Sequence, residues 1–288
     1  MNTNSQTNNN LSITQYQRYL RIDMKYRQGA NNHQKSINRT KLTTLIVVRF
    51  GIIAPVIIRS LYGISQHQAL EHLNKLVREG LLQIVKTHRS TDGRVYVPTY
   101  AAAKFAEELM CIEVYFRSQS NPALQFNHNN VMHNLINMYV MLKGLNNRNT
   151  NGPAEQLWNG FVTEPEFKRL ANKTIRAVDG LVQEPDGTVI CTEIEHSFKK
   201  KGTRQIILLK YLDALKKGYY SKIFIFSQSK LIFDDIKRLH EQLFVELCTR
   251  YDKKSKQPLL SAADAELLKS SIIYRTKFCD DLQKLFYP

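Results

Sequence analysis

The chain has 288 residues, 43% of them hydrophobic, with 41 lysines and arginines against 25 aspartates and glutamates and a formal net charge of +16. It is long enough for two domains with real cores, and its charge points to a polyanionic partner, most often nucleic acid. Four scattered cysteines exclude a CxxC zinc site, and the polar start argues against a signal peptide. No apolar run is long enough for a membrane span, so we expect a cytoplasmic protein.

Residues 1–40 are expected to form a polar, basic and partly disordered segment. Residues 41–112 show a compact series of helix and strand signals. In order, the sequence predicts a helix at 42–50, a helix from Pro55 to Gly63, a third helix over 65–79, strands at 81–88 and 95–99 around the turn R-S-T-D-G-R, and a helix at 101–110. Apolar residues of the third helix recur at helical spacing, which leaves His72 on the outward face.

Three helices followed by a two-stranded hairpin resemble the winged helix-turn-helix of MarR-like regulators. In that fold the third helix enters the major groove of DNA, and the hairpin, or wing, contacts phosphates. The resemblance implies binding of double-stranded DNA. The residues that would make these contacts are Gln66, His67, Gln68, Lys75, Arg89 and Arg94. The alternative is a winged helix that contacts only protein.

Residues 113–126 are expected to be a linker, and residues 127–288 a second domain. Its predicted elements are a helix at 127–145, strands at 174–183 and 188–197 joined by the turn E-P-D-G, a basic helix at 203–217, a strand at 222–227, a helix at 230–247, a short strand at 271–275 and a final helix. This order predicts a mixed α/β domain around a central sheet, so that the whole chain is α/β, or α+β overall.

The stretch I-C-T-E-I-E-H at 190–196 is the most informative part of the chain. Alternate residues of a strand point to one face, so Glu193 and Glu195 share a face, where their charges repel unless a metal ion or a proton lies between them. The E-P-D-G turn pairs the two strands so that Asp179 falls close to Glu193. An aspartate and a glutamate on adjacent strands suit Mg²⁺ or Mn²⁺, which can polarise a scissile phosphate.

This arrangement resembles the restriction-endonuclease-like PD-(D/E)XK nuclease core, in which Asp and Glu bind metal and a lysine two residues later aids catalysis. Here Glu195 occupies the lysine position, and Lys210 on the following helix is a candidate substitute. With the winged helix, the series D-G, E-I-E and K-Y resembles the MOBC family of plasmid relaxases over roughly residues 42–250.

The MOBC resemblance implies a metal-dependent, strand-specific nick at a plasmid transfer origin, which starts conjugative mobilisation together with accessory mobilisation and coupling proteins. It assigns Asp179 and Glu193 to the metal and gives catalytic roles to both and to Glu195 and Lys210. Tyr211 would be the nucleophile that joins DNA covalently. A later tyrosine of the family matches either Tyr219 or Tyr220.

Simpler interpretations stand beside these. Asp179-Gly180 could be turn chemistry, the two glutamates could line the solvated face of an edge strand, and Tyr211 could be a core residue. His196 is expected to be a surface or structural residue rather than a ligand, and His128 and His133 are five residues apart and so miss the i, i+4 spacing of helical zinc pairs. We assign them no metal, with the alternative that His133 lines the cleft.

Basic residues around the start of the helix at 203–217 are expected to contact the DNA backbone, with a solvated loop as the alternative. They are Lys199, Lys200, Lys201 and Arg204. Two other functions remain open. One is a hydrolytic endonuclease, for which Tyr211 would be dispensable. The other is a non-catalytic plasmid replication or regulatory DNA-binding protein that keeps a degenerate nuclease fold.

Overall fold

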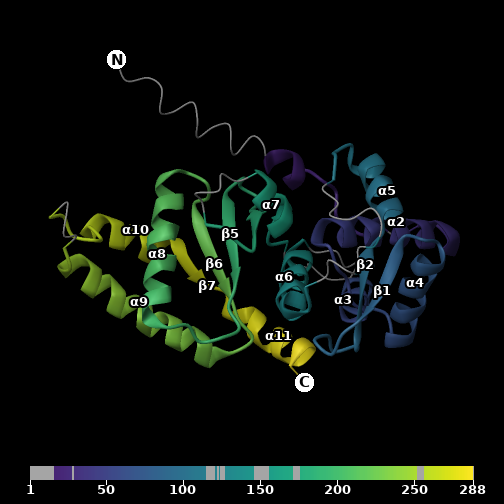
Figure 1. Cartoon of the computed structure of the whole chain (residues 1–288). Coiled ribbons are helices and arrows are strands. Elements are labelled where there is room, and N and C mark those ends of the chain that lie inside the picture. Colours follow the sequence, from purple (N-terminus) through teal and green to yellow (C-terminus); the bar gives the residue numbers. More distant parts are fainter. Residues whose placement is uncertain are drawn as a thin grey trace, which may run out of the picture.

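The protein has a mixed α/β architecture with a two-stranded sheet and a five-stranded mixed sheet. It is seen in a computed structural model that describes residues 16–27, 29–114, 121, 123, 127–145, 156–170, 176–251 and 256–287. In Figure 1 the N-terminal helices and the small sheet lie at one end, the larger sheet lies at the other, and helices α6 and α7 lie between them. The expected linker at 113–126 falls mostly outside the described residues.

The N-terminal elements follow the expected order. They are α2 (Asn32–Phe50), α3 (Pro55–Tyr62), α4 (Gln66–Arg78), β1 (Leu82–Lys86), β2 (Arg94–Pro98) and α5 (Tyr100–Met110). Helix α2 begins at Asn32 rather than at 42, because the side chain of Asn31 accepts a hydrogen bond from Gln34 N and caps the helix there. Part of the segment expected to be loosely ordered is packed, since Tyr16 and Tyr19 are buried.

The hairpin of β1 and β2 is held against the helices by Asp92 in its turn. One carboxylate oxygen accepts from Val56 N at 3.2 Å, at the start of α3, and the other accepts from Gln66 Nε2 at 2.5 Å, at the start of α4. The only acidic side chain of the turn is therefore occupied by the helices.

The C-terminal elements build a five-stranded sheet in the order β3-β4-β5-β6-β7. They are η2 (His128–Asn130), α6 (Val131–Gly144), β3 (Gly160–Thr163), α7 (Glu164–Leu170), β4 (Gly180–Gln183), β5 (Val189–Ile194), α8 (Lys201–Lys216), β6 (Lys222–Phe226), α9 (Lys230–Thr249), α10 (Ala262–Ser271), β7 (Ile272–Tyr274), η3 (Thr276–Phe278) and α11 (Cys279–Phe286). Strands β3, β4 and β5 pair antiparallel, and β5, β6 and β7 pair parallel. The central mixed sheet was expected, whereas β3, α7 and α10 were not.

Alternation along the strands divides the core between the two faces of the sheet. On β6, Ile223 and Ile225 pack in the cluster that contains α8, α9 and α10, while Phe224 and Phe226 pack with α6 and α11. Helix α6 is buried nearly all round, which is typical of a helix between two layers. One hydrophobic cluster runs from α2–α4 through α6 to the sheet.

None of the helices within the described ranges combines the length and hydropathy needed to cross a membrane. The four cysteines are free, with Cys191 and Cys279 buried and Cys111 exposed.

His72 departs from the prediction that it faces outward. Its Nε2 lies 2.9 Å from Thr43 Oγ1 on α2. Burial, and then the charges of Arg39 and Lys75, lower its pKa to about 4. The cause is the longer α2, which covers the side of α4 that a helix beginning at 42 would leave open.

We expect His72 to make a contribution to stability that is lost as the pH falls from 6.5 towards 4, because the unfolded chain takes up a proton at His72 in this range and the folded chain does not. The shift corresponds to at most about 3 kcal/mol of unfolding free energy. In urea unfolding across this range, the stability of His72→Gln relative to the wild-type protein should rise as the pH falls, because the variant lacks this loss. His67→Gln on the exposed side of α4 should show no such change. An unchanged pH profile for His72→Gln would contradict the burial of this side chain.

Candidate metal centre

Asp179 lies where the hairpin turn predicts. Strands β4 and β5 pair Gly180 with Thr192, so the next position along places Asp179 opposite Glu193. Glu184 N donates to Thr188 O at 2.9 Å, and Gly187 takes a φ of +90°, which closes the predicted turn. The prediction that Asp179 falls near Glu193 is confirmed.

Gly180 follows Asp179 at a position where a side chain has no room, between Met141 of α6 and the backbone of β3. A Cβ at this position would lie 2.0 Å from Met141 Cε and 2.6 Å from Val162 O. Asn137 Nδ2 then donates to Asp179 O at 2.7 Å. The interpretation of Asp179-Gly180 as turn chemistry is therefore wrong. Gly180 belongs to β4, and its lack of a side chain lets Met141 of α6 pack against the strand.

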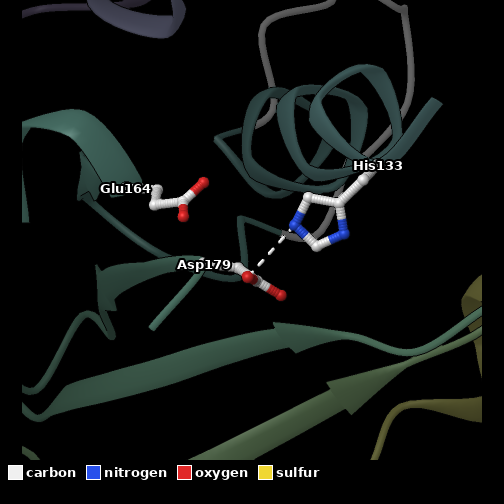
Figure 2. A group of neighbouring side chains, drawn as sticks. All are labelled: His133, Glu164 and Asp179. Atoms are coloured by element: carbon white, nitrogen blue, oxygen red, sulfur yellow. Dashed lines mark ion pairs between the residues drawn. The ribbon is translucent and has the colours of Figure 1, made fainter. Parts of the chain in front are cut away.

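His133, Glu164 and Asp179 come from three elements and point toward one another (Figure 2). Their nearest ligand atoms all lie within 4.8 Å of one another. His133 lies on α6, Glu164 begins α7, and Asp179 immediately precedes β4. One imidazole nitrogen and two carboxylates form a donor set that suits a divalent transition metal such as Mn²⁺.

Asp179 is held in its charged form. Burial alone would raise its pKa, but the hydrogen bond and charge of His133 and the backbone N–H of Ile194 lower it below its ordinary value. His133 Nε2 lies 3.1 Å from Asp179 Oδ1, and Ile194 N donates to Oδ2 at 2.7 Å. On its other side, His133 Nδ1 lies 3.3 Å from His196 Nε2, so His196 orients the ring that faces the carboxylates.

Glu193, expected as the second metal ligand, belongs to a different pair. Arg176 donates from Nε to Oε1 at 3.1 Å and from Nη2 to Oε2 at 2.6 Å, so both carboxylate oxygens are occupied. Burial, with the charge of Asp179, raises the pKa of Glu193 to about 7, and Arg176 opposes this shift. The structure brings Glu193 close to Asp179 but leaves it out of the ligand group.

Glu195 is also neutralised by basic side chains. Its Oε1 accepts from Arg204 Nη1 at 2.8 Å, and its Oε2 lies 2.6 Å from Lys199 Nζ. Glu193 on β5, the middle strand of the sheet, is 3% exposed, and Glu195, directly after the end of β5, is 1% exposed. The interpretation of these residues as the solvated face of an edge strand is therefore wrong.

The expected DNA contact by Arg204 is also wrong, because Arg204 is fully buried and paired with Glu195. Lys199 is half-buried in its pair with Glu195, and Lys201 pairs with Glu246 on α9. Lys200 is exposed. Most of this basic segment serves the fold.

Lys210 and Tyr211 lie on different sides of α8. Lys210 is exposed, whereas Tyr211 is fully buried against the sheet. Burial, and then the charge of Glu193, raise the pKa of Tyr211 far above its ordinary value. A phenol that is buried and hard to ionise is a poor nucleophile. The structure therefore matches the core interpretation of Tyr211, and it does not bring Lys210 to the carboxylates.

Residues of α4 that were expected to face DNA have several roles. Gln66 holds the wing through Asp92, and Lys75 Nζ donates to Ser36 Oγ of α2 at 3.0 Å. Gln68 forms a capping box with Ser65, in which each side chain accepts from the other's backbone N–H. His67 is exposed.

The wing is strongly basic. Arg89 and Arg94 are exposed, as expected, and so is Lys86, which the sequence reasoning missed. The strand register places Lys86 directly opposite Arg94. Like charges in that position destabilise a hairpin, so this pair lowers the stability of the wing.

Glu164 and Arg176 of the carboxylate corner were missed by the sequence analysis, and His133, which was assigned no metal there, belongs to the candidate ligand group. The spacing of His128 and His133 tests only for two ligands on one helix, whereas the partners of His133 come from other elements. The pattern T-E-P-E at 163–166 is a capping-box signal that predicts a helix start but not what lies beside it.

Comparisons with known proteins found no matching family model, no matching curated protein and no matching solved structure. The function is therefore inferred from the chemistry of the residues themselves.

We expect Gly180→Ala to destabilise the protein by about 1–3 kcal/mol, because the added methyl would meet the carbonyl oxygen of Val162 on β3 and crowd Met141 of α6. The local shift of β4 would move the neighbouring Asp179 relative to His133 and weaken divalent-metal binding. Gly202→Ala on α8 is the matched control, since a Cβ there meets nothing within 4 Å. Urea unfolding and Mn²⁺ titration would measure both effects. Unchanged stability and unchanged Mn²⁺ affinity for Gly180→Ala would refute this account of the α6 contact.

Proposed function

We propose that the chain nicks DNA with the help of a divalent metal ion held by His133, Glu164 and Asp179. The observation that carries the proposal is the convergence of these three side chains around a charged, partly buried Asp179. When bound, the ion would polarise the scissile phosphate. The nitrogen donor favours Mn²⁺ over Mg²⁺, which prefers oxygen ligands.

Recognition of DNA is assigned to the N-terminal helices and the wing. Helices α2, α3 and α4 followed by the β1–β2 hairpin are similar to a winged helix, in which α4 would face the major groove. Exposed His67 on α4 and the basic wing residues Lys86, Arg89 and Arg94 are the proposed contacts. The net charge of +16 supports a polyanionic partner.

The setting of the reaction is proposed from the MOBC resemblance. The order α6, β3, α7, β4, β5, α8, β6, apart from the short α7, is similar to the PD-(D/E)XK nuclease core, and Asp179 lies opposite Glu193. We propose that the chain acts in the cytoplasm at a plasmid transfer origin, alongside accessory mobilisation and coupling proteins.

A second candidate is a hydrolytic endonuclease, and the burial of Tyr211 favours it over a covalent relaxase mechanism. Water would then attack the phosphate. Tyr219, which is half-buried, is more accessible than Tyr211 or Tyr220.

Asp179→Asn should abolish nicking of supercoiled cognate plasmid with Mn²⁺, because it removes the charge at the centre of the ligand group. Binding of the DNA duplex should persist, because the proposed contacts lie on α4 and the wing. Asp186→Asn in the exposed turn of the same hairpin is the control and should nick normally. Wild-type nicking by Asp179→Asn would exclude the site.

Tyr211→Phe should nick as well as the wild-type protein, with no protein–DNA adduct in either, because the hydroxyl is buried and hard to ionise. Tyr219→Phe is the companion variant. Denaturing gels with and without protease would detect an adduct. A wild-type adduct that only Tyr211→Phe removes would overturn the hydrolytic account and restore the relaxase nucleophile.

A further inference from the structure

Arg49 joins the N-terminal helices to the turn between β3 and α7. It lies in the last turn of α2 and is 3% exposed. Its Nε donates to Glu166 Oε1 at 2.7 Å, and its Nη2 donates to Glu166 Oε2 at 2.9 Å and to Phe161 O at 2.7 Å. The carbonyl of Arg49 accepts from Thr163 Oγ1 at 2.9 Å. Arg49 therefore holds the turn both through its guanidinium group and through its backbone carbonyl.

The same turn carries Glu164. Thr163 N donates to Glu166 Oε2 at 2.9 Å, and Glu166 N donates to Thr163 Oγ1 at 3.5 Å, which forms a capping box at the start of α7. Glu164 lies between Thr163 and Glu166, both of which Arg49 contacts. Its carboxylate is one of the three groups of the metal centre and also accepts from Lys168 Nζ on α7, so both the turn and the start of α7 set where this carboxylate lies.

A purely stabilising role is a poor explanation for this pair. Taking an arginine and a glutamate out of water costs free energy that their attraction repays only in part, and apolar residues often join two helices as firmly. An apolar contact would not supply directional hydrogen bonds that fix where α7 begins. The Arg49–Glu166 pair supplies two of them.

We propose that Arg49 is a positioning residue of the metal centre, which sets the place of the Glu164 carboxylate through Glu166 and Thr163 and so sets the affinity for a divalent cation. The inference rests on the metal centre of the proposed function but not on DNA cleavage. Since α2 also packs against α5 and β2, the residue connects the proposed DNA-recognition unit to the centre.

Calorimetric titration of the full chain with Mn²⁺ tests the inference. Arg49→Lys keeps the charge but loses the two-pronged pairing, and it should raise the Kd for Mn²⁺ about tenfold or more. Arg169→Met, on the same helix α7 as Glu164, is the control and should leave the Kd unchanged.

A paired variant separates positioning from stability. Arg49→Met with Glu166→Leu replaces the buried charges by apolar groups and should recover stability in urea, whereas the Kd should stay raised. Arg49→Lys combined with Glu164→Gln should bind Mn²⁺ no more weakly than Glu164→Gln alone, because both changes act on one ligand. A wild-type Kd in folded Arg49→Lys and in the paired variant would overturn the inference.

Nicking assays on the same samples separate this inference from the proposed function. If Arg49→Lys weakens Mn²⁺ binding but the wild-type protein never nicks DNA, the positioning role stands and the function fails. If the wild-type protein nicks and Arg49→Lys leaves the Kd unchanged, the function stands and the positioning role fails. If the wild-type protein binds no Mn²⁺, the metal centre and the role of Arg49 fall together.

Discussion

The side chains of Glu193 and Glu195 are buried at the end of β5, where water cannot stabilise their charges. A buried carboxylate stays ionised when a basic side chain is paired with it. Arg176 supplies that cation for Glu193, and Arg204 with Lys199 supplies it for Glu195. These pairs tie the segment before β4 and the start of α8 to the middle strand. The position of Asp179 depends on them, since it lies between Arg176 and β4.

The buried glutamates of the sheet are thus paired with basic side chains, whereas Lys86 and Arg94 on the wing form no ion pair with any of the residues that the structure describes. Lys86 faces Arg94 across the hairpin, and Asp92, the acid of the turn, is used by α3 and α4. Like charges directly opposite each other destabilise the hairpin, and binding of a polyanion would relieve this repulsion. Under the proposed function the basic wing would hold DNA and the carboxylate corner would cut it, and α2 connects the two parts through its contacts with β2 and the pair of Arg49 with Glu166.

Local patterns predicted much of this molecule. The turn E-P-D-G set the β4–β5 register, and period-two alternation set Glu193 and Glu195 on one face, as the structure shows. The sequence also indicated that something positive must accompany the pair. It could not show that this would be Arg176 and Arg204 rather than a metal, because both arginines reach the strand only through the tertiary fold. Strand β3 and helix α7 were not predicted because they are short, and the role of Glu164 at the start of α7 was therefore not predicted either.

The central claim is that His133, Glu164 and Asp179 bind a divalent cation. Anomalous diffraction from crystals grown with Mn²⁺ tests it most directly. The account predicts a single strong peak between His133 Nε2 and the carboxylates of Glu164 and Asp179, with Arg176 still paired to Glu193. A peak between Asp179 and Glu193 with Arg176 displaced, or no peak in this corner at all, would contradict it.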